Sequence, residues 1–240
     1  HLINDTRVYN PIQKKRVTIK ASEVAACVGV NNYRPTYEVI CDIWKKNNPQ
    51  NFDGLTKTET NEMTVNSSEE AKCLFNNLEK EIPKNSEEVI KLIETSVTAI
   101  ENIKDLDSNQ KKMVTDHIRK MVYTNHGTRT EDTTADLDDA ELHTDNKFYK
   151  TTVIEITGTT YEIVGRIDRY QMNEDGTKTL VEIKNRTKGL FKKVRDYENV
   201  QVQTYLQMLN LQKARLVEQY NDERLSYTID VDHVMWNEMI

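Results

Sequence analysis

The stretch "GRIDRYQMNEDGTKTLVEIKNRTK", residues 165–188, carries the residues whose types and spacing best suit chemistry. Polar and apolar residues alternate with a period of two on both sides of "NEDG", which predicts a β-hairpin. On the second strand this alternation puts Glu182 and Lys184 on one face. A three-residue loop that ends at a left-handed Gly176 would pair Asp168 with Glu182, whereas a slip of one residue would undo that pairing.

Two carboxylates that face each other on a sheet repel, and a half-buried site cannot ionise both at low cost. A divalent cation removes the repulsion, and Mg²⁺ is commonly bound by one or two carboxylates, several waters and a substrate phosphate. Lys184 would then stabilise developing negative charge, or orient and activate a water. These residues form a minimal set for phosphodiester hydrolysis. The alternative is that all three charges point into water, since E-x-K arises by chance on charged strands.

The composition is that of a folded, helix-rich protein, with 30% charged and 37% hydrophobic residues among 240. The length fits one large domain or two small ones, and we expect a single domain over 1–240. No apolar run approaches a membrane span and no signal peptide is present, so we expect an intracellular protein, in the cytoplasm or nucleus of a host cell, that is not secreted. Cys27, Cys41 and Cys73 are too few and too widely spaced for a disulfide framework, a CxxC metal site or an iron–sulfur cluster.

Charge is distributed unevenly along a chain whose net charge is −6. Acidic residues dominate 131–145, and basic residues dominate just after the hairpin, from Lys184 to Arg195. The negative net charge is not typical of a nucleic-acid-binding protein, but the basic stretch could lie along a phosphate backbone. The alternative is a solvated basic loop.

Hydrophobic periodicity predicts a series of helices, then a cluster of strands, then a helix followed by strands. We expect an irregular arm over 1–17, followed by a helix with Ser22 as its N-cap. Residues 47–70 should form a loop or insertion. Glycine is unfavourable inside a helix, so Gly127 should mark either close packing or a break. The expected helices span 36–46, 71–82, 86–104, 108–137 and 198 to about 211. The expected strands span 147–157, 160–171, 177–187, a segment that begins at Ala214, and 223–232. A terminal turn or helix follows the last strand. This order predicts an α/β or α+β core with helices on both sides.

Four segments carry a further pattern: "TIKASEVAACVGVNNYRPTYEV" (18–39), "HGTRTED" (126–132), "VGRIDRY…LVEIKNRT" (164–187) and "YENVQVQTYLQM" (197–208). In their content and order they resemble the phage lambda-type exonuclease family, the YqaJ-like viral recombinase nucleases of the PD-(D/E)XK superfamily. The resemblance covers most of the chain except roughly 47–110, which we expect to be a helical insertion. It implies a restriction-endonuclease-like PD-(D/E)XK core, in which a mixed central sheet is flanked by helices.

For the chemistry, the resemblance implies that Mg²⁺ or Mn²⁺ is held by three acids, Asp168, Glu182 and Glu131. Lys184 would act on the attacking water, and Gln201 would support the site from the following helix. Without the resemblance, Glu131 would be a solvated helix charge and Gln201 a surface amide. The implied substrate is DNA, with duplex ends digested 5′-to-3′ in viral or phage-type recombination or replication. Family members can form ring-shaped trimers and act beside a single-strand annealing protein, so both are open possibilities for this chain.

For substrate binding, the resemblance implies a phosphate site near the first helix, where Ser22 or neighbouring basic residues would contact the DNA. The predicted substrate-binding residues are Ser22, Lys15, Arg16, Arg34, Tyr205, Arg186 and Lys188. The structural alternatives are a helix cap for Ser22 and a packed aromatic ring for Tyr205. His126 is a further metal-ligand candidate, because a histidine ahead of the same motif binds Mn²⁺ in the endonucleases that snatch caps from RNA.

Two features depart from the family pattern. Ile167 precedes Asp168 where the motif has proline, and the net charge is acidic for a DNA enzyme. Other functions therefore stay open. They are a metal-dependent endonuclease of the same superfamily that cuts DNA or RNA, a non-catalytic nucleic-acid-binding module with the same fold, and a structural α+β protein.

Overall fold

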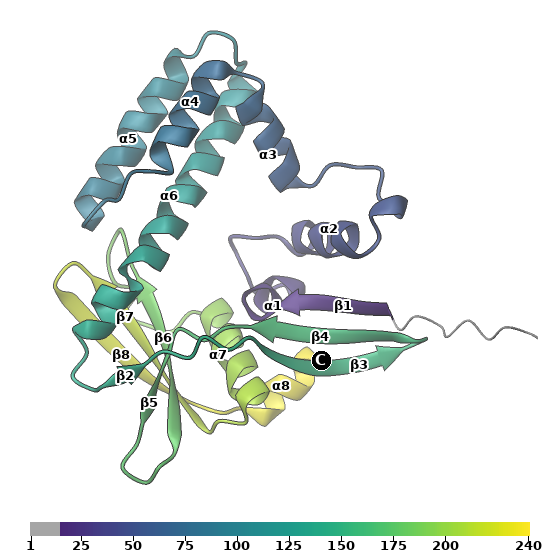
Figure 1. Ribbon diagram of the computed structural model, residues 1–240, viewed down its shortest axis with the longest axis vertical. Coiled ribbons are helices and arrows are strands. Elements are labelled where there is room, and N and C mark those ends of the chain that lie inside the picture. The colour runs from purple at the N-terminus through teal and green to yellow at the C-terminus, as the bar shows by residue number, and fades with distance from the viewer. Residues whose placement is uncertain (1–14) are drawn as a thin grey trace, which may run out of the picture.

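The computed structural model describes residues 15–240, which form a mixed α/β structure with two sheets (Figure 1). The larger sheet has the order β2-β5-β6-β7-β8. Its strands are β2 (Leu142–His143), β5 (Arg169–Met172), β6 (Lys178–Asn185), β7 (Lys213–Tyr220) and β8 (Glu223–Asp230). β6 and β7 run parallel, and the other neighbours are antiparallel. The mixed sheet predicted from the sequence is confirmed.

The centre of this sheet is buried on both faces, which explains the apolar run around Val181 in β6. Leu180 and Leu216 pack with the helix α7 (Asp196–Leu209) in one core. Val181 belongs to a smaller core on the opposite face, together with Ala135 at the end of the long helix α6 (Ser108–Asp136). The two helices therefore cover opposite faces of the strand that carries the predicted acid and lysine.

The smaller sheet has the order β1-β4-β3, from β1 (Lys15–Lys20), β4 (Thr159–Gly165) and β3 (Tyr149–Ile156). β1 pairs parallel to β4. The expectation of an irregular arm over 1–17 is therefore wrong for 15–17, and residues 1–14 lie outside the described part of the chain. The single strand expected over 160–171 is also wrong, because β4 and β5 belong to different sheets. The alternating pattern runs through this break and so does not reveal it.

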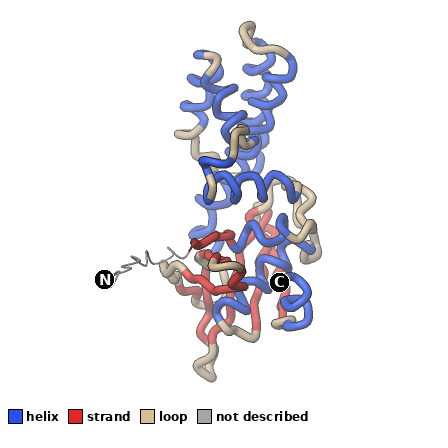
Figure 2. Tube along the Cα trace, turned by 90° about the vertical axis from the view of Figure 1, so that its right-hand side faces the viewer, coloured by secondary structure: helices blue, strands red, loops and turns tan. Residues whose placement is uncertain are grey.

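A helical arm stands away from the sheets, formed by α3 (Lys57–Asn66), α4 (Glu69–Leu78), α5 (Ser86–Asn102) and the first half of α6 (Figures 1 and 2). It has its own apolar core, in which Val89, Ile93 and Ile118 are buried. The loop expected over 47–70 is wrong, since α3 lies within it. That helix has little apolar periodicity, but Thr56 at its N-terminus accepts a hydrogen bond from Glu59 N in a capping box.

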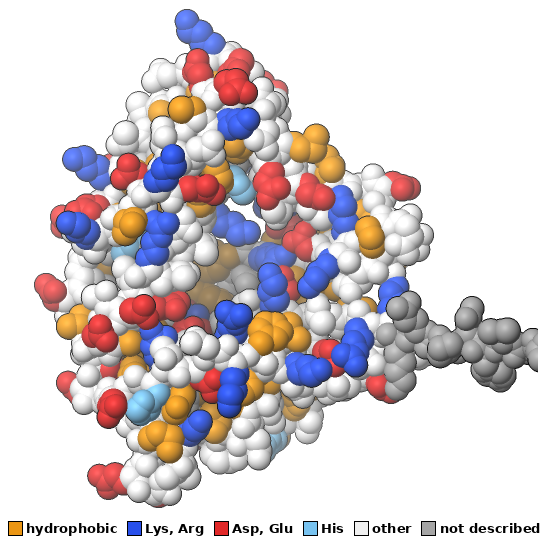
Figure 3. Space-filling view, viewed as in Figure 1, with side chains coloured by type: hydrophobic (Ala, Val, Ile, Leu, Met, Phe, Trp, Pro, Cys, Tyr) orange, Lys and Arg blue, Asp and Glu red, His pale blue; other side chains and the backbone are white. Residues whose placement is uncertain are grey.

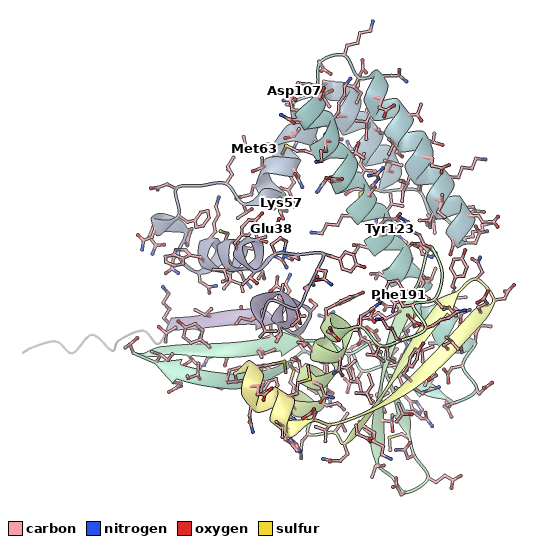
Figure 4. The ribbon with its side chains drawn as sticks, turned by 180° about the vertical axis from the view of Figure 1, so that it is seen from behind. Glu38, Lys57, Met63, Asp107, Tyr123 and Phe191 are labelled. Atoms are coloured by element: carbon pink, nitrogen blue, oxygen red, sulfur yellow. The ribbon has the colours of Figure 1, made fainter. Side chains whose placement is uncertain are left out.

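The N-terminal helices α1 (Ala21–Cys27) and α2 (Thr36–Asn47) lie between the arm and the smaller sheet (Figure 1). Ser22 does not cap α1, because the helix already begins at Ala21 and its cap is the Glu23 carboxylate, which accepts from Lys20 N (3.0 Å). Small buried residues of α1 pack against α7. Lys57 Nζ lies 2.8 Å from Glu38 Oε1 and links α2 to the arm (Figure 4). The remaining elements are η1 (Pro49–Asn51) and α8 (His233–Met239).

No helix in residues 15–240 combines the length and the apolar character that crossing a membrane would require.

Two glycines give opposite expectations for the same substitution. A Cβ at Gly127 would meet nothing within 4 Å, so this residue marks neither the close packing nor the break expected from the sequence. A Cβ at Gly165 would lie 2.9 Å from Tyr205 Cε1 and 3.1 Å from Ala21 Cβ. We predict that Gly127→Ala raises the free energy of unfolding by about 1 kcal/mol, and that Gly165→Ala lowers it by about 1–3 kcal/mol through overpacking. Denaturant titration of both variants measures this, and equal effects would contradict the packing described for α7.

Candidate active site

The β5–β6 hairpin has the turn that its sequence predicts. Asn173 N donates to the Thr177 carbonyl (2.9 Å), and Gly176 has a φ of +80°, which glycine adopts without a Cβ penalty. The connection is the expected three-residue loop of residues 174–176.

Asp168 lies one residue before β5. The hairpin ladder ends where Arg169 pairs with Val181, and Asp168 lies at a bend just before it. Asp168 Oδ2 accepts a hydrogen bond from Ile183 N (3.0 Å), which holds its carboxylate against the edge of β6. The direct pairing of Asp168 with Glu182 thus stays a prediction, although the charge of Asp168 acts on Glu182 from nearby.

Glu182 and Lys184 form a buried ion pair on the α7 face of β6. Lys184 Nζ lies 2.7 Å from Glu182 Oε1 and 3.3 Å from Gln201 Oε1 on α7. The side chain of Glu182 is 2% exposed and that of Lys184 22%. The second carboxylate oxygen, Glu182 Oε2, is buried and has no hydrogen-bond partner. An unpartnered buried oxygen of this kind is costly unless a further group binds it.

Glu131 approaches the site from α6, which Asn185 fastens to the end of β6. The Asn185 side chain donates to the Gly127 carbonyl (3.2 Å) and accepts from Thr134 Oγ1 (2.6 Å), one turn on either side of Glu131. The sequence analysis missed this role of Asn185, although its place directly after Lys184 made it a candidate.

A hollow of about 180 Å³ lies between α6 and the end of β6. We call it the α6 hollow, and its lining includes Tyr123, Gly127, Glu131, Lys184 and Asn185. Figure 3 shows the molecule hollowed between the helical arm and the strands, with Lys and Arg side chains around the recess. Glu131 and Lys184 therefore share one solvent-accessible space.

Burial raises the pKa of all three acids, and their mutual repulsion adds to it. Desolvation followed by the charge of Asp168 raises the pKa of Glu182 to about 7. Desolvation also raises the pKa of Asp168, against the opposing effect of Lys184 and with the charge of Glu131 adding to the rise. The pKa of Glu131 rises through desolvation and then through Glu182. The three carboxyls form one electrostatically coupled group.

Lys184 has the opposite balance. Desolvation lowers its pKa, but the charges of Glu182 and Asp168 outweigh that effect, and the net pKa is raised. The lysine is therefore protonated at neutral pH and acts as a cation and hydrogen-bond donor.

The donor set fits a divalent cation bound by few protein ligands. Among residues 15–240, no three His, Cys, Asp or Glu side chains gather into a ready-made metal cluster. Asp168 is turned to Ile183 N and one oxygen of Glu182 to Lys184, which keeps the acids apart. However, Mg²⁺ needs only one or two carboxylates when water and substrate supply its other ligands. The unpartnered Glu182 Oε2 is an oxygen that such a cation could use.

Ser22 and Tyr205 line a second cavity of about 450 Å³. Lys20, Lys46 and Arg166 also line it, which the sequence analysis missed because these residues come from three separate segments. Tyr205 is buried against Gly165, and its side chain is hydrogen-bonded to Gln201. The cavity therefore borders the helix face that supports Lys184. Three cations beside two hydroxyls suit a phosphate group.

The other predicted substrate-binding residues differ in how exposed they are and in whether they are already paired within the protein. Lys188 is exposed, with its ammonium 5.8 Å from the ring centroid of Tyr123. Arg16 is 61% exposed and 4.0 Å from Glu162. Arg34 is paired with Glu23 (3.2 Å) and Asp42 (2.5 Å). Lys15 Nζ is hydrogen-bonded to Asn48.

Arg186 lies in a buried network and not at the surface. Its guanidinium contacts Glu198 Oε1 at 2.8 Å and Glu218 Oε1 at 2.5 Å, and both carboxylates are buried. Because its charge is compensated inside the protein, we omit it from the proposed substrate-binding set. His126 is also buried, and it lines a cavity that does not include Glu131. Burial lowers the pKa of its imidazole, and its Nδ1 has no hydrogen-bond partner.

Comparison with known proteins gives little further information. No family model matches the chain, and no curated protein matches it. Among solved structures, one described as "Crystal structure of SSO0001" is similar over 74% of this chain and 81% of that chain, with 17% identity and a TM-score of 0.40. A likeness this weak carries no argument about fold or function.

The raised pKa values predict that the metal-free protein loses stability as the pH rises. Below the ordinary pKa of 4.5, Glu182 is protonated whether the chain is folded or unfolded. Between pH 4.5 and about pH 7 only the unfolded chain releases this proton. The contribution of Glu182 to the free energy of unfolding therefore falls over this range and is constant above it. Thermal unfolding at a series of pH values measures this. Added Mn²⁺ should raise the melting temperature more at pH above this range than below it.

The matched control compares two acids of the same hairpin. Asp168→Asn removes a charge that raises the pKa of Glu182, so the fall with pH should become shallower. Asp175→Asn, at the exposed hairpin tip, should leave the fall unchanged. A pH profile that Asp168→Asn does not alter would contradict the coupling between the acids.

Proposed function

We propose that this protein is a metal-dependent nuclease with a PD-(D/E)XK-type core, which hydrolyses phosphodiester bonds in DNA. The observation that carries the proposal is the buried acid Glu182, which has one unpartnered oxygen and lies beside Lys184 on β6, with Asp168 on the same hairpin close enough for its charge to act on Glu182. The resemblance to the lambda-type exonuclease family supports action on duplex ends in the 5′-to-3′ direction, in viral or phage-type recombination or replication.

Asp168, Glu182 and Glu131 would hold Mg²⁺ or Mn²⁺. The ion supplies a Lewis acid for the phosphate and lowers the pKa of a bound water. The carboxyls must be ionised to take this part. Because their pKa values are raised, protons compete with the cation, so binding should strengthen as the pH rises through the range in which the acids ionise, and the bound cation would relieve their repulsion.

Lys184 would stabilise the negative charge that develops on the phosphate oxygens. The raised pKa keeps Lys184 protonated. A protonated lysine can stabilise negative charge and orient a water, but it cannot take a proton from that water. Glu182 and Gln201 fix its ammonium in place, which reduces the reorganisation needed during reaction.

Ser22 and Tyr205, with the cations of the same cavity, would bind a phosphate of the substrate strand. Lys188 and Arg16 are exposed and could contact the backbone further away. Trimer formation and a single-strand annealing partner remain predictions from the resemblance alone. The first alternative is an endonuclease of the same superfamily that cuts DNA or RNA, and the second is a binding module without activity.

The decisive variant is Lys184→Gln. The glutamine amide can still donate to buried Glu182, whereas alanine would leave that carboxylate uncompensated. Removing one pre-positioned charge-stabilising donor typically costs about 10²–10³ in rate, so we expect a loss of this size in Mg²⁺-dependent cleavage of end-labelled linear duplex. Lys178→Gln, an exposed position on the same strand, should cleave like the wild type.

Closed circular duplex distinguishes the modes of cleavage. An exonuclease leaves the circle intact, and a cut circle would favour the endonuclease alternative. Absence of any metal-dependent cleavage, together with no heat of Mn²⁺ binding in calorimetry, would leave only the binding module or a structural protein.

A further inference from the structure

Arg169 is a buried cation to which the mechanism above gives no role. It is the first residue of β5, is 8% exposed and is paired with Val181 across the hairpin. Residues paired across a ladder lie on the same face of a sheet, and Val181 packs with Ala135 of α6. Arg169 therefore lies on the face that the end of α6 covers (Figure 1), whereas Glu182 lies on the other face.

The guanidinium of Arg169 joins the bend before β5 to α6. Its Nη1 donates to the Asp168 carbonyl (2.6 Å), and its Nη2 contacts Asp132 Oδ1 on the helix. Asp132 directly follows Glu131 in the chain. One side chain thus contacts the backbone of one predicted metal-binding acid and the neighbour of another, which the fixed, planar set of donors on an arginine makes possible.

The ion pair with Asp132 does not by itself account for the burial of this cation. The side chain of Arg169 is 10% exposed, but that of Asp132 is 88% exposed, and water screens a pair with so exposed a partner. A buried charge needs compensation nearby. Glu131 and Asp168 supply it: desolvation raises the pKa of both acids, and the charge of Arg169 opposes that rise in both.

The contacts of Arg169 complement those that Asn185 makes to the same helix. Asn185 binds the Gly127 carbonyl and Thr134 Oγ1, and so relates α6 to the end of β6. Arg169 relates α6 to the bend that carries Asp168. Together the two side chains locate the Glu131 turn of α6 relative to both parts of the hairpin.

We propose that Arg169 is a positioning residue of the metal centre, which holds Glu131 beside Asp168 so that both acids can bind the same divalent cation. In this role it touches neither the cation nor the substrate and acts only through the two acids. This inference rests on the metal-dependent nuclease function proposed above. It adds a residue, outside the acids and the lysine of the hairpin motif, on which metal binding depends.

A competing role for Arg169 predicts the opposite change in metal affinity. A buried guanidinium among acids can occupy the place of a metal ion and weaken metal binding by repulsion. Its removal would then strengthen Mn²⁺ binding, whereas removal of a positioning residue should weaken it. Loss of a side chain that orients metal ligands typically costs about 10–100-fold in metal affinity.

The test measures the affinity of the full chain for Mn²⁺ by calorimetry without DNA, together with the melting temperature of each variant without metal. We expect Arg169→Met to bind Mn²⁺ about 10–100-fold more weakly than the wild type. Arg169→Lys keeps the charge, but its single ammonium cannot form the same two contacts. We expect this variant also to bind more weakly than the wild type, which separates geometry from charge.

Asp132→Ala tests the same contact from the side of the helix and leaves Arg169 in place. The position is exposed and alanine favours a helix, so the fold is retained. We expect Mn²⁺ binding about tenfold weaker, at the lower end of the same range. Asp136→Ala, the same change at an exposed acid one turn further along α6, is the matched control and should bind like the wild type. If Arg169→Met fails to fold, these two variants decide the inference.

The outcomes separate this inference from the function on which it rests. Unchanged or tighter Mn²⁺ binding by folded Arg169→Met, or equal binding by Asp132→Ala and Asp136→Ala, would overturn the positioning role and leave the nuclease function standing. Weaker binding by Arg169→Met and Asp132→Ala, in a protein whose wild type cleaves no DNA with Mg²⁺ or Mn²⁺, would support the positioning role and overturn the nuclease function. A wild type that binds no Mn²⁺ would overturn both.

Discussion

The buried ion pair of Glu182 and Lys184 is the interaction on which the candidate site depends. Glu182 lies at the centre of a sheet that helices cover on both faces, where an isolated carboxylate would be very costly. Lys184 supplies the opposite charge from two residues further along the same face, and Gln201 on α7 accepts from its ammonium. Removing either partner would leave the other charge buried without compensation. The ion pair therefore requires β6 and α7 to keep their present positions. The same burial raises the pKa of Glu182.

A second buried network fixes the crossover that brings α7 into position. Arg186, directly after β6, joins Glu198 in the first turn of α7 to Glu218 on β7. Its planar guanidinium can satisfy two carboxylates at once, which a lysine could not do in the same geometry. Glu218 also accepts from the backbone N of Phe191 and Lys192. The start of α7 is therefore held at three points, and this sets the place of Gln201 and Tyr205 one and two turns later.

An acidic protein can still offer a basic path to a nucleic acid, because the arrangement of charge matters more than its sum. The net charge is −6, yet Lys20, Lys46 and Arg166 converge on one cavity beside the site. Glu218, Glu198 and Asp138 are meanwhile neutralised by buried or half-buried arginines. These three acids are therefore held in ion pairs, and Lys and Arg side chains lie around the recess (Figure 3).

The sequence by itself determined the features that depend on near neighbours. These are the hairpin turn at Gly176, the register of the β5–β6 hairpin, and most of the helix spans, since turn chemistry and periodicity act over a few residues. Only the tertiary structure decided that residues 160–171 divide between two sheets. It also decided that Arg186 is held in a buried ion pair while Lys188 is exposed, and that Asn185 binds α6 beside Glu131. Those outcomes depend on contacts between segments far apart in the chain, such as Arg186 with Glu218 and Asn185 with Gly127. The burial of a charge and the partner that compensates it are properties of the packed molecule, and no local pattern contains them.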